Sequence, residues 1–246
     1  MQLSGKVAIV TGAARGLGRA YCEALAKEGA RVVAADLNPC TDTIDAIVAA
    51  GGSGVAIQVD VSNAESCDSM AQRAMETFGR VDVLINNAGM SPLYKSLTDV
   101  SQDLFDKVMN VNLRGPFRLS ALFGQQMFND GNGSIINVSS IAAAQPSPHE
   151  VPYGAAKAGL HSLTKSFSRA YAPHVRVNCI MPGPFLTDIS DAWSDATHES
   201  LKHLPLGRGG HPDEVVGAAL YFASEASSYT TGAVLKIDGG SIASTS

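Results

Sequence analysis

The sequence predicts an α/β fold, with a doubly wound parallel sheet of seven strands flanked by helices. Short apolar runs rich in Val, Ile and Ala recur along the chain and alternate with segments of helical periodicity. The composition is 45% hydrophobic but only 6% aromatic, so the core must be built from small aliphatic side chains. That composition suits a parallel sheet that is covered on both faces. No linker, repeat or low-complexity tract interrupts the alternation, and we therefore expect a single domain over residues 1–246.

The first predicted unit is a strand, a glycine-rich turn and a helix. Lys6–Val10 is a short, β-branched apolar run, and the turn Thr11–Gly18 follows it directly. The helix after this turn ends at Gly29, which suits a left-handed cap. Glycines in such a turn let the backbone approach a pyrophosphate, whose charge is favoured at a helix N-terminus. A tight turn without a ligand is the alternative.

The second strand, Arg31–Ala35, places Asp36 at its carboxyl end. A carboxylate there can accept both ribose hydroxyls of an adenosine and repels a 2′-phosphate, which favours NAD over NADP. Arg15, in the glycine turn, is the opposing signal, because a basic residue there suits NADP.

The remaining elements continue the alternation. The helix after residue 62 opens with the capping box Ser62–Glu65, and Gly115–Pro116 predicts a local irregularity in the helix that starts near Ser101. The other predicted strands are Gly54–Val59, Val81–Ile85, Gly133–Ser139, Val175–Ile180 and Ala233–Ile237, and the other helices are Thr41–Ala50, Pro152–Ala170 and one from Pro212, with a polar lid over residues 188–206.

Tyr153 and Lys157 are four residues apart on a predicted helix, so both heads point at the same space. At about 4 Å and an effective dielectric constant of about 20, two unit charges interact by about 4 kcal/mol. We therefore expect the ammonium of Lys157 to lower the pKa of the Tyr153 phenol by about three units, before any desolvation cost is subtracted. Taken alone, the pair could equally be a solvated surface pair.

The TGxxxGxG turn, Asp36, Asn86–Gly89, Asn112 and the Ser140…Tyr153…Lys157 set together resemble the short-chain dehydrogenase/reductase family over essentially the whole chain. The resemblance implies a Rossmann-type sheet with ligands at the carboxyl ends of the strands. It also implies the catalytic residues Asn112, Ser140, Tyr153 and Lys157. The cofactor-binding residues that it implies are Gly12, Arg15, Gly16, Leu17, Gly18, Asp36, Leu37, Asp60, Val61, Asn87, Ala88, Gly89, Tyr153, Lys157, Pro182, Gly183, Phe185 and Thr187. Phe185 departs from the family pattern, in which a smaller β-branched residue is usual.

The reaction that these residues indicate is the reversible oxidation of a secondary alcohol to a ketone with NAD. Tyr153 acts as general acid/base, Lys157 stabilises its phenolate, Ser140 hydrogen-bonds the reacting oxygen, and Asn112 helps to hold a water. Reduction of 3-oxoacyl thioesters with NADPH is one alternative. A cofactor-bound regulatory protein without catalysis is the other.

Substrate contacts are expected from the loops beside the catalytic groups, where the apolar members prevail. The predicted substrate residues are Ile141, Ala142, Met90, Leu93 and Trp193. This set favours a hydrophobic alcohol over a charged one. We expect His149 and Glu150 to face solvent.

The net charge of −5 and the absence of a basic run argue against nucleic-acid and membrane partners. The four cysteines show no ligand spacing, so we expect no metal, and they suit a cytoplasmic protein with reduced thiols. The resemblance and the small residues Ala155, Ala156, Ala158 and Gly159 favour a homotetramer.

Overall fold

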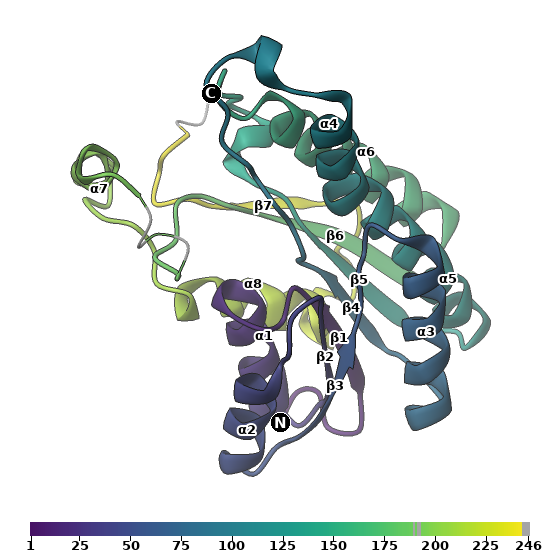
Figure 1. Cartoon of the computed structure of the whole chain (residues 1–246). Coiled ribbons are helices and arrows are strands. Elements are labelled where there is room, and N and C mark those ends of the chain that lie inside the picture. Colours follow the sequence, from purple (N-terminus) through teal and green to yellow (C-terminus); the bar gives the residue numbers. More distant parts are fainter. Residues whose placement is uncertain (189, 191–192, 243–246) are drawn as a thin grey trace.

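The computed structural model describes residues 1–188, 190 and 193–242, and it confirms the predicted sheet. In this part of the chain seven parallel strands form one sheet in the order β3-β2-β1-β4-β5-β6-β7 (Figure 1). The strands are β1 (Val7–Thr11), β2 (Arg31–Asp36), β3 (Ser53–Gln58), β4 (Val83–Asn86), β5 (Gly133–Val138), β6 (Val175–Pro182) and β7 (Val234–Ile237). The order reverses between β1 and β4, the point at which doubly wound sheets bind ligands.

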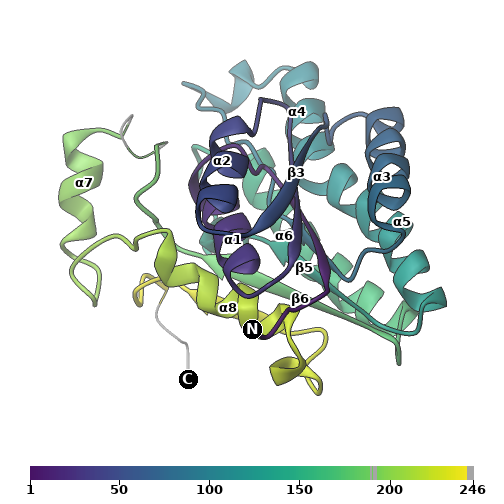
Figure 2. The same ribbon diagram turned by 90° about the horizontal axis from the view of Figure 1, so that it is seen from below.

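Helices cover both faces of the sheet (Figures 1 and 2). One layer contains α1 (Gly16–Lys27), α2 (Thr41–Ala49) and α8 (Asp213–Ala223). The other contains α3 (Ala64–Phe78), α4 (Gln102–Met109), α5 (Gly115–Asn129) and α6 (Val151–Ala170). A short helix, α7 (Asp195–Leu201), stands away from both layers in the two views.

The core divides into two clusters because side chains along a strand alternate between the faces of the sheet. From β1, Ala8 and Val10 join the cluster under α1 and α8, whereas Val7 and Ile9 join the cluster under α3 and α5. All four of these β1 side chains are fully buried. The near-continuous apolar strands of the sequence are therefore explained by burial on two faces.

All four cysteines, Cys22, Cys40, Cys67 and Cys179, are buried and free. Burial raises the pKa of each thiol, to about 11 for Cys40 and Cys67. Cys22, Cys67 and Cys179, on α1, α3 and β6, are fully buried, and Cys40 is 3% exposed.

The predicted irregularity before α5 is a π-helical turn, Asn110–Arg114, between α4 and α5. The helix passes close to another segment directly after this turn: a Cβ on Gly115 would lie 2.3 Å from the carbonyl oxygen of Val61. Pro116, in the first turn of α5, also has no N–H to donate. One expected helix is thus two helices joined by a wider turn, and such turns are frequent at functional sites.

The start of β4 also differs from the sequence prediction. The predicted strand begins at Val81, but the strand in the structure begins at Val83. The carboxylate of Asp82, just before it, accepts a hydrogen bond from the backbone N–H of Val7 at 2.8 Å. Arg80 and Lys6 pair with the same carboxylate. Asp82 is 3% exposed, so these partners surround a buried carboxylate at the amino-terminal end of β4.

No helix in residues 1–188, 190 and 193–242 combines the length and the apolar character needed to cross a bilayer. Over the same residues, no group of three or more His, Cys, Asp and Glu side chains is placed to hold a metal ion.

Candidate active site

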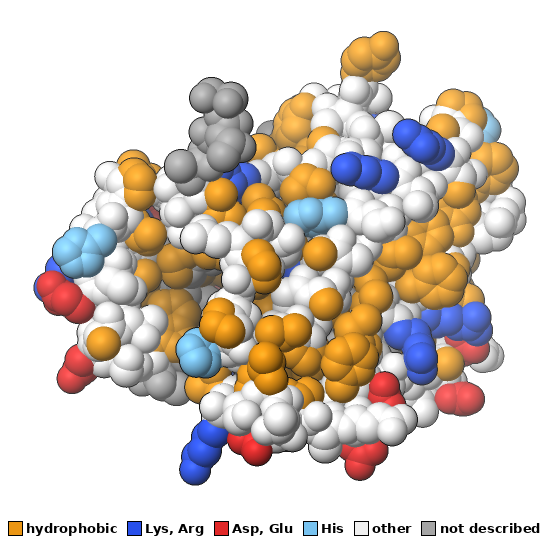
Figure 3. All heavy atoms as spheres, turned by 90° about the horizontal axis from the view of Figure 1, so that it is seen from above, with side chains coloured by type: hydrophobic (Ala, Val, Ile, Leu, Met, Phe, Trp, Pro, Cys, Tyr) orange, Lys and Arg blue, Asp and Glu red, His pale blue; other side chains and the backbone are white. Residues whose placement is uncertain are grey.

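The predicted site residues gather at the carboxyl ends of β1, β4 and β5, since all these strands point the same way. Seen from above, hydrophobic and uncharged side chains cover the middle of this end of the molecule, and Asp and Glu lie mainly at its margins (Figure 3).

The glycine turn after β1 admits no side chain at two of its positions. Gly12 has a φ of +67°, and a Cβ there would lie 2.8 Å from the Cα of Ala88. A Cβ on Gly18 would lie 1.9 Å from the carbonyl oxygen of Gly12. Asn87 holds the turn in place, because its Nδ2 donates to the carbonyl oxygens of Thr11 at 2.9 Å and Gly12 at 3.2 Å. The turn is thus a preformed, open stretch of backbone.

The N-terminus of α1 faces this turn without a side-chain cap. Arg15 occupies the N-cap position, makes no capping hydrogen bond and is exposed. Backbone N–H groups at such a helix start can bind an anion, which the positive end of the helix dipole also favours. The turn and the helix start therefore fit the pyrophosphate of a dinucleotide.

Asp36 ends β2 beside the turn, as the sequence predicts. Its Oδ2 accepts a hydrogen bond from the backbone N–H of Ala14 at 3.0 Å, and its Oδ1 accepts one from the N–H of Asn38 at 2.9 Å. The carboxylate is therefore fixed in orientation at the place where an adenosine ribose would lie. Leu37, next to it, is 58% exposed.

Asp60 and Val61 follow β3. The Oδ1 of Asp60 accepts hydrogen bonds from the N–H of Ser62 at 2.9 Å and from its hydroxyl at 2.6 Å. Val61 is buried against the residues under α3 and α5. Both residues shape the end of the sheet next to Gly115.

Lys157 lies inside the protein, one turn after Tyr153 on α6. It is 3% exposed, and its Nζ donates to the carbonyl oxygen of Val138 at 2.8 Å. The Nζ lies 5.6 Å from the centroid of the Tyr153 ring. Burial lowers the pKa of Lys157 to about 8.

The pKa of Tyr153 corrects the expectation from the sequence. Burial, with a smaller contribution from the nearby charge of Glu150, raises this pKa to about 12, and the neighbouring Ser140 hydroxyl lowers it only in part. The expected downward shift does not appear, because the desolvation of the phenolate outweighs the interactions that favour it.

The two serines that follow β5 have different surroundings, as the sequence indicated. Ser139 is buried, and its hydroxyl donates to the carbonyl oxygen of Lys157 at 3.1 Å. Ser140 is half-buried, and its Oγ accepts from the N–H of Ala142 at 3.2 Å. Ser139 thus anchors α6, whereas the Ser140 hydroxyl is the one that meets Tyr153.

Asn112, in the π-helical turn, is fully buried and tied to the loop after β4. Its Nδ2 donates to the carbonyl oxygens of Met90 at 2.8 Å and Val108 at 2.9 Å, and its Oδ1 accepts from the N–H of Met90 at 3.2 Å. A Cβ on Gly89 would lie 2.9 Å from Asn112 Oδ1 and 3.4 Å from Lys157 Nζ. Gly89, Asn112 and Lys157 therefore converge.

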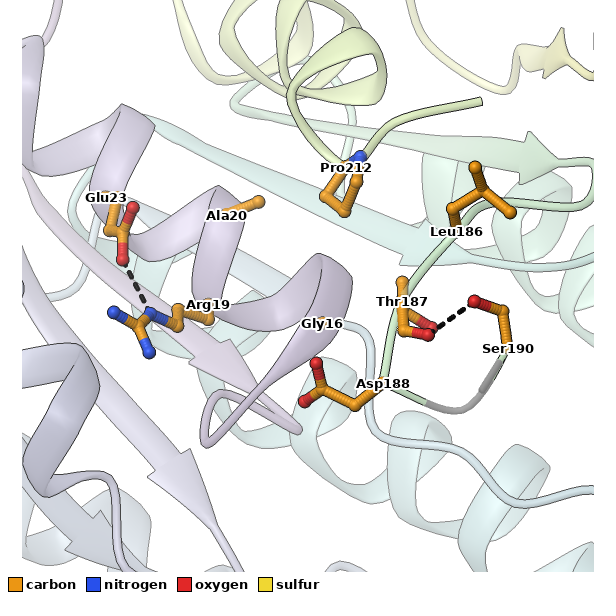
Figure 4. Close-up of a pocket in the computed structure, with 9 residues that line it drawn as sticks. All are labelled: Gly16, Arg19, Ala20, Glu23, Leu186, Thr187, Asp188, Ser190 and Pro212. Carbon is orange, nitrogen blue, oxygen red and sulfur yellow. Dashed lines mark hydrogen bonds and ion pairs between the residues drawn. The ribbon is translucent and has the colours of Figure 1, made fainter. Parts of the chain in front are cut away.

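The segment after β6 brings Gly16 and Thr187 together. A Cβ on Gly16 would lie 3.5 Å from the Thr187 side chain, and both residues line an open pocket of about 380 Å³ between the start of α1 and residues 186–188 and 190 (Figure 4). Pro182 ends β6, and Gly183 packs on Asp238. Phe185 is 7% exposed and lies in the core cluster under α1 and α8, so its ring packs in the core.

The predicted substrate residues differ in burial and in the elements that carry them. Met90 lies beside Asn112, and Ile141 and Ala142 follow Ser140 in a short 3₁₀ turn. Ala142 is 3% exposed, whereas Leu93 is 87% exposed. Trp193 packs against His198 of α7, with ring centroids 5.9 Å apart.

Sequence reasoning missed Glu150. We expected it to face solvent with His149, but it is half-buried and lines a small cavity with Tyr153. Its position directly before the helix that carries Tyr153 was the available signal.

Comparisons with known proteins agree with this geometry. Residues 12–241 match a family model described as "Enoyl-(Acyl carrier protein) reductase". The chain is 36% identical to the 3-oxoacyl-[acyl-carrier-protein] reductase of Thermotoga maritima, covering 98% of this chain and 99% of the relative. It is 37% identical to an L-rhamnose 1-dehydrogenase (NAD(P)(+)) of Sphingomonas sp., covering 97% and 96% of the two chains.

A further relative and a solved structure are also similar to the chain over nearly its whole length. The chain is 35% identical to the NAD-dependent glycerol dehydrogenase of Listeria innocua, covering 97% of this chain and 94% of the relative. A short-chain type dehydrogenase/reductase from Mycobacterium marinum superposes with a TM-score of 0.92 at 32% identity, covering 98% and 97% of the two chains.

Proposed function

Because the chain belongs to the short-chain dehydrogenase/reductase family, we propose that it interconverts a secondary alcohol and a ketone with NAD. Its membership makes it an NAD(P)-dependent oxidoreductase that acts on CH–OH groups. The observation that supports this reaction is the meeting of Gly89, Asn112 and Lys157 one helical turn from Tyr153.

A bound nicotinamide supplies the hydride acceptor or donor. In oxidation, the phenol oxygen of Tyr153 takes the proton of the substrate hydroxyl, and in reduction it returns a proton to the carbonyl oxygen. The Ser140 hydroxyl hydrogen-bonds the same substrate oxygen. Lys157 stabilises the phenolate form by its charge, and its hydrogen bond to Val138 fixes the position of the ammonium.

The proposed choice of NAD follows from Asp36. Its carboxylate is oriented by Ala14 and Asn38 and would stand against a doubly charged 2′-phosphate. Arg15, the basic residue that would suit NADP, is exposed and makes no capping bond. We therefore infer that Asp36 decides the preference.

The alternative substrate class is a 3-oxoacyl thioester, and the name of the Thermotoga relative favours it. The deciding experiment follows nicotinamide absorbance with NAD and a panel of secondary alcohols, and with NADPH and acetoacetyl thioesters. We expect turnover of alcohols with NAD. Efficient thioester reduction with NADPH and no alcohol oxidation would reject the proposal in favour of the alternative. Cofactor binding without turnover on either panel would indicate a regulatory protein.

A further inference from the structure

Glu150 directly precedes α6 and lies three residues before Tyr153. An acidic residue at a helix N-cap commonly accepts a hydrogen bond from a backbone N–H in the first turn. Glu150 makes no such capping bond. Its Oε2 accepts instead from the hydroxyl of Ser91, at 3.3 Å, in the loop after β4. The carboxylate is therefore turned away from its own helix and toward the loop that leads from the NNAG segment.

Tyr94, in the same loop after β4, binds the backbone both before and after Glu150. The hydroxyl of Tyr94 donates to the carbonyl oxygen of Pro148 at 3.1 Å and accepts from the N–H of Val151 at 2.7 Å. Two backbone groups that flank Glu150 are thus bound to one side chain of the loop. The position of the carboxylate is consequently built into the fold.

Glu150 and Tyr153 line the same small cavity, which is otherwise enclosed mainly by apolar groups of Pro92, Tyr94, Leu104, Val108 and Pro152. Its volume of about 10 Å³ is too small for a substrate, and it establishes only that the two side chains are neighbours. Part of Glu150 remains exposed, so the residue is accessible from outside the protein as well as lining this cavity.

The carboxylate also has unused hydrogen-bonding capacity. An ionised carboxylate offers about four acceptor positions, and the only hydrogen bond to the Glu150 side chain within the described ranges comes from Ser91. Those residues contribute no ion pair to it either. Burial raises the pKa of this carboxyl, as expected for a charge with few partners. A donor on a ligand would supply the missing partner.

We propose that Glu150 determines substrate specificity: its carboxylate accepts a hydrogen bond from a second hydroxyl next to the one that reacts at Tyr153. The enzyme then prefers neutral vicinal diols and other polyhydroxylated compounds to simple alcohols, and it disfavours hydroxy acids whose carboxylate would face Glu150. This inference rests on the proposed alcohol oxidation. It also replaces the hydrophobic alcohol that the apolar loop residues suggested.

The test uses a matched pair of substrates, 2-butanol and 2,3-butanediol, which differ by the neighbouring hydroxyl. We expect kcat/KM of the wild-type enzyme to be about tenfold higher for the diol, a difference of about 1.4 kcal/mol. Glu150→Ala should bring the ratio close to one, mainly through a higher KM for the diol. Glu150→Gln, which keeps the shape and one acceptor but removes the charge, should give an intermediate ratio.

His149→Ala is the matched control, because His149 is exposed and adjacent in the chain, and it should keep the wild-type ratio. The charge of Glu150 also acts on Tyr153, but that effect changes both substrates alike and cancels in the ratio. Calorimetric titration of each variant with NAD verifies that the cofactor site is folded.

Three results would overturn the role of Glu150 while leaving alcohol oxidation intact. The first is an equal kcat/KM for the two substrates in the wild type, and the second is a ratio that Glu150→Ala leaves unchanged. The third is a preference for 3-hydroxybutyrate over both. If the wild type oxidised no alcohol with either NAD or NADP, the proposed function itself would fail, and this inference with it.

Discussion

At the scale of single residues, the site depends on the balance between burial and charge around Tyr153. Burial raises the pKa of the phenol to about 12 and lowers the pKa of Lys157 to about 8. Burial thus shifts both groups toward their neutral forms. The phenolate that alcohol oxidation needs must be stabilised by the Lys157 charge and by hydrogen bonds such as that of Ser140, which also act on the substrate oxygen.

Replacing Tyr153 by Phe should abolish turnover and leave NAD binding within about threefold of wild type. The ring and its packing are kept, but the transferable proton is lost, and general acid–base catalysis contributes about 10²–10⁴-fold. The measurements are kcat on the best alcohol and calorimetric titration with NAD. Near wild-type turnover in the variant would refute the assigned role of Tyr153.

The pH dependence of oxidation follows from the two shifts. The phenol holds its proton more tightly than a free tyrosine, so kcat/KM for an alcohol should rise with pH through the neutral range. The rise should end near pH 8, where the ammonium that stabilises the phenolate begins to lose its proton. Glu150→Gln removes a negative charge that raises the Tyr153 pKa, and should move the rising limb to lower pH. A limb that stays in place would contradict this coupling.

Asp36→Ala should narrow the preference for NAD over NADP, because it removes the carboxylate that opposes a 2′-phosphate. The comparison is kcat/KM for the two cofactors in both proteins. Asp36→Ala also removes the acceptor of the Ala14 N–H. Arg15→Ala, which leaves Asp36 in place, should keep or increase the preference for NAD. A wild-type preference for NADP would show that Arg15 dominates.

At the scale of elements, Asp82 connects the amino-terminal end of β1 to the amino-terminal end of β4. Its side chain accepts from the N–H of Val7, and its own carbonyl oxygen accepts from the N–H of Ser134 in β5. Three adjacent strands therefore meet at one buried acid.

Asp82→Ala should lower the free energy of unfolding by about 1–3 kcal/mol, because the Val7 N–H and the paired cations lose a buried acceptor. The control is Asp68→Ala, which breaks an ion pair with Arg118 whose two side chains are 45% and 42% exposed. Exposed pairs contribute about 0–1 kcal/mol. Urea unfolding measures both, and equal losses would show that the burial of Asp82 is unimportant.

The strands and glycine turn could be predicted from the sequence because local pattern specifies them. Apolar runs such as Val7–Val10 are buried on both faces, and Gly18 is required by its approach to the carbonyl oxygen of Gly12 within the turn. The π-helical turn between α4 and α5 lies next to the approach of Gly115 to Val61, which is far away in the chain. The surroundings of Glu150 depend likewise on Ser91 and Tyr94. Pattern alone does not indicate such distant contacts.

At the scale of the whole molecule, several large apolar side chains remain on the surface of the helical layer that contains α4, α5 and α6. Phe105 and Phe117 are 43% and 47% exposed. The Phe117 ring lies 5.7 Å from Phe167 of α6, which stacks on Tyr171 at 5.6 Å. The small residues Ala155 and Ala158 are exposed on the same helix. This surface supports the proposed homotetramer, since one copy could cover another here.

Phe117→Glu should therefore reduce the mass that light scattering reports at micromolar concentration, because a charge would be placed in the proposed interface. Val48→Glu is the control. Val48 lies on α2, in the opposite helical layer, and is 58% exposed, so its variant should keep the wild-type mass. A wild-type protein that is monomeric would rule out the tetramer.

The enclosure of all four thiols has a practical consequence for following the enzyme in solution. Alkylating reagents react with the thiolate form of cysteine. Two properties therefore protect the native thiols: reagents cannot reach them, and their raised pKa values keep them protonated. Iodoacetamide should label them only when the chain opens, and the labelling rate in urea should trace unfolding. In the folded protein, the four native thiols should therefore not react with thiol reagents. A cysteine introduced by Leu93→Cys, where the side chain is 87% exposed, would be a single reactive handle on the loop beside the site. A fluorophore placed there could report ligand arrival in real time.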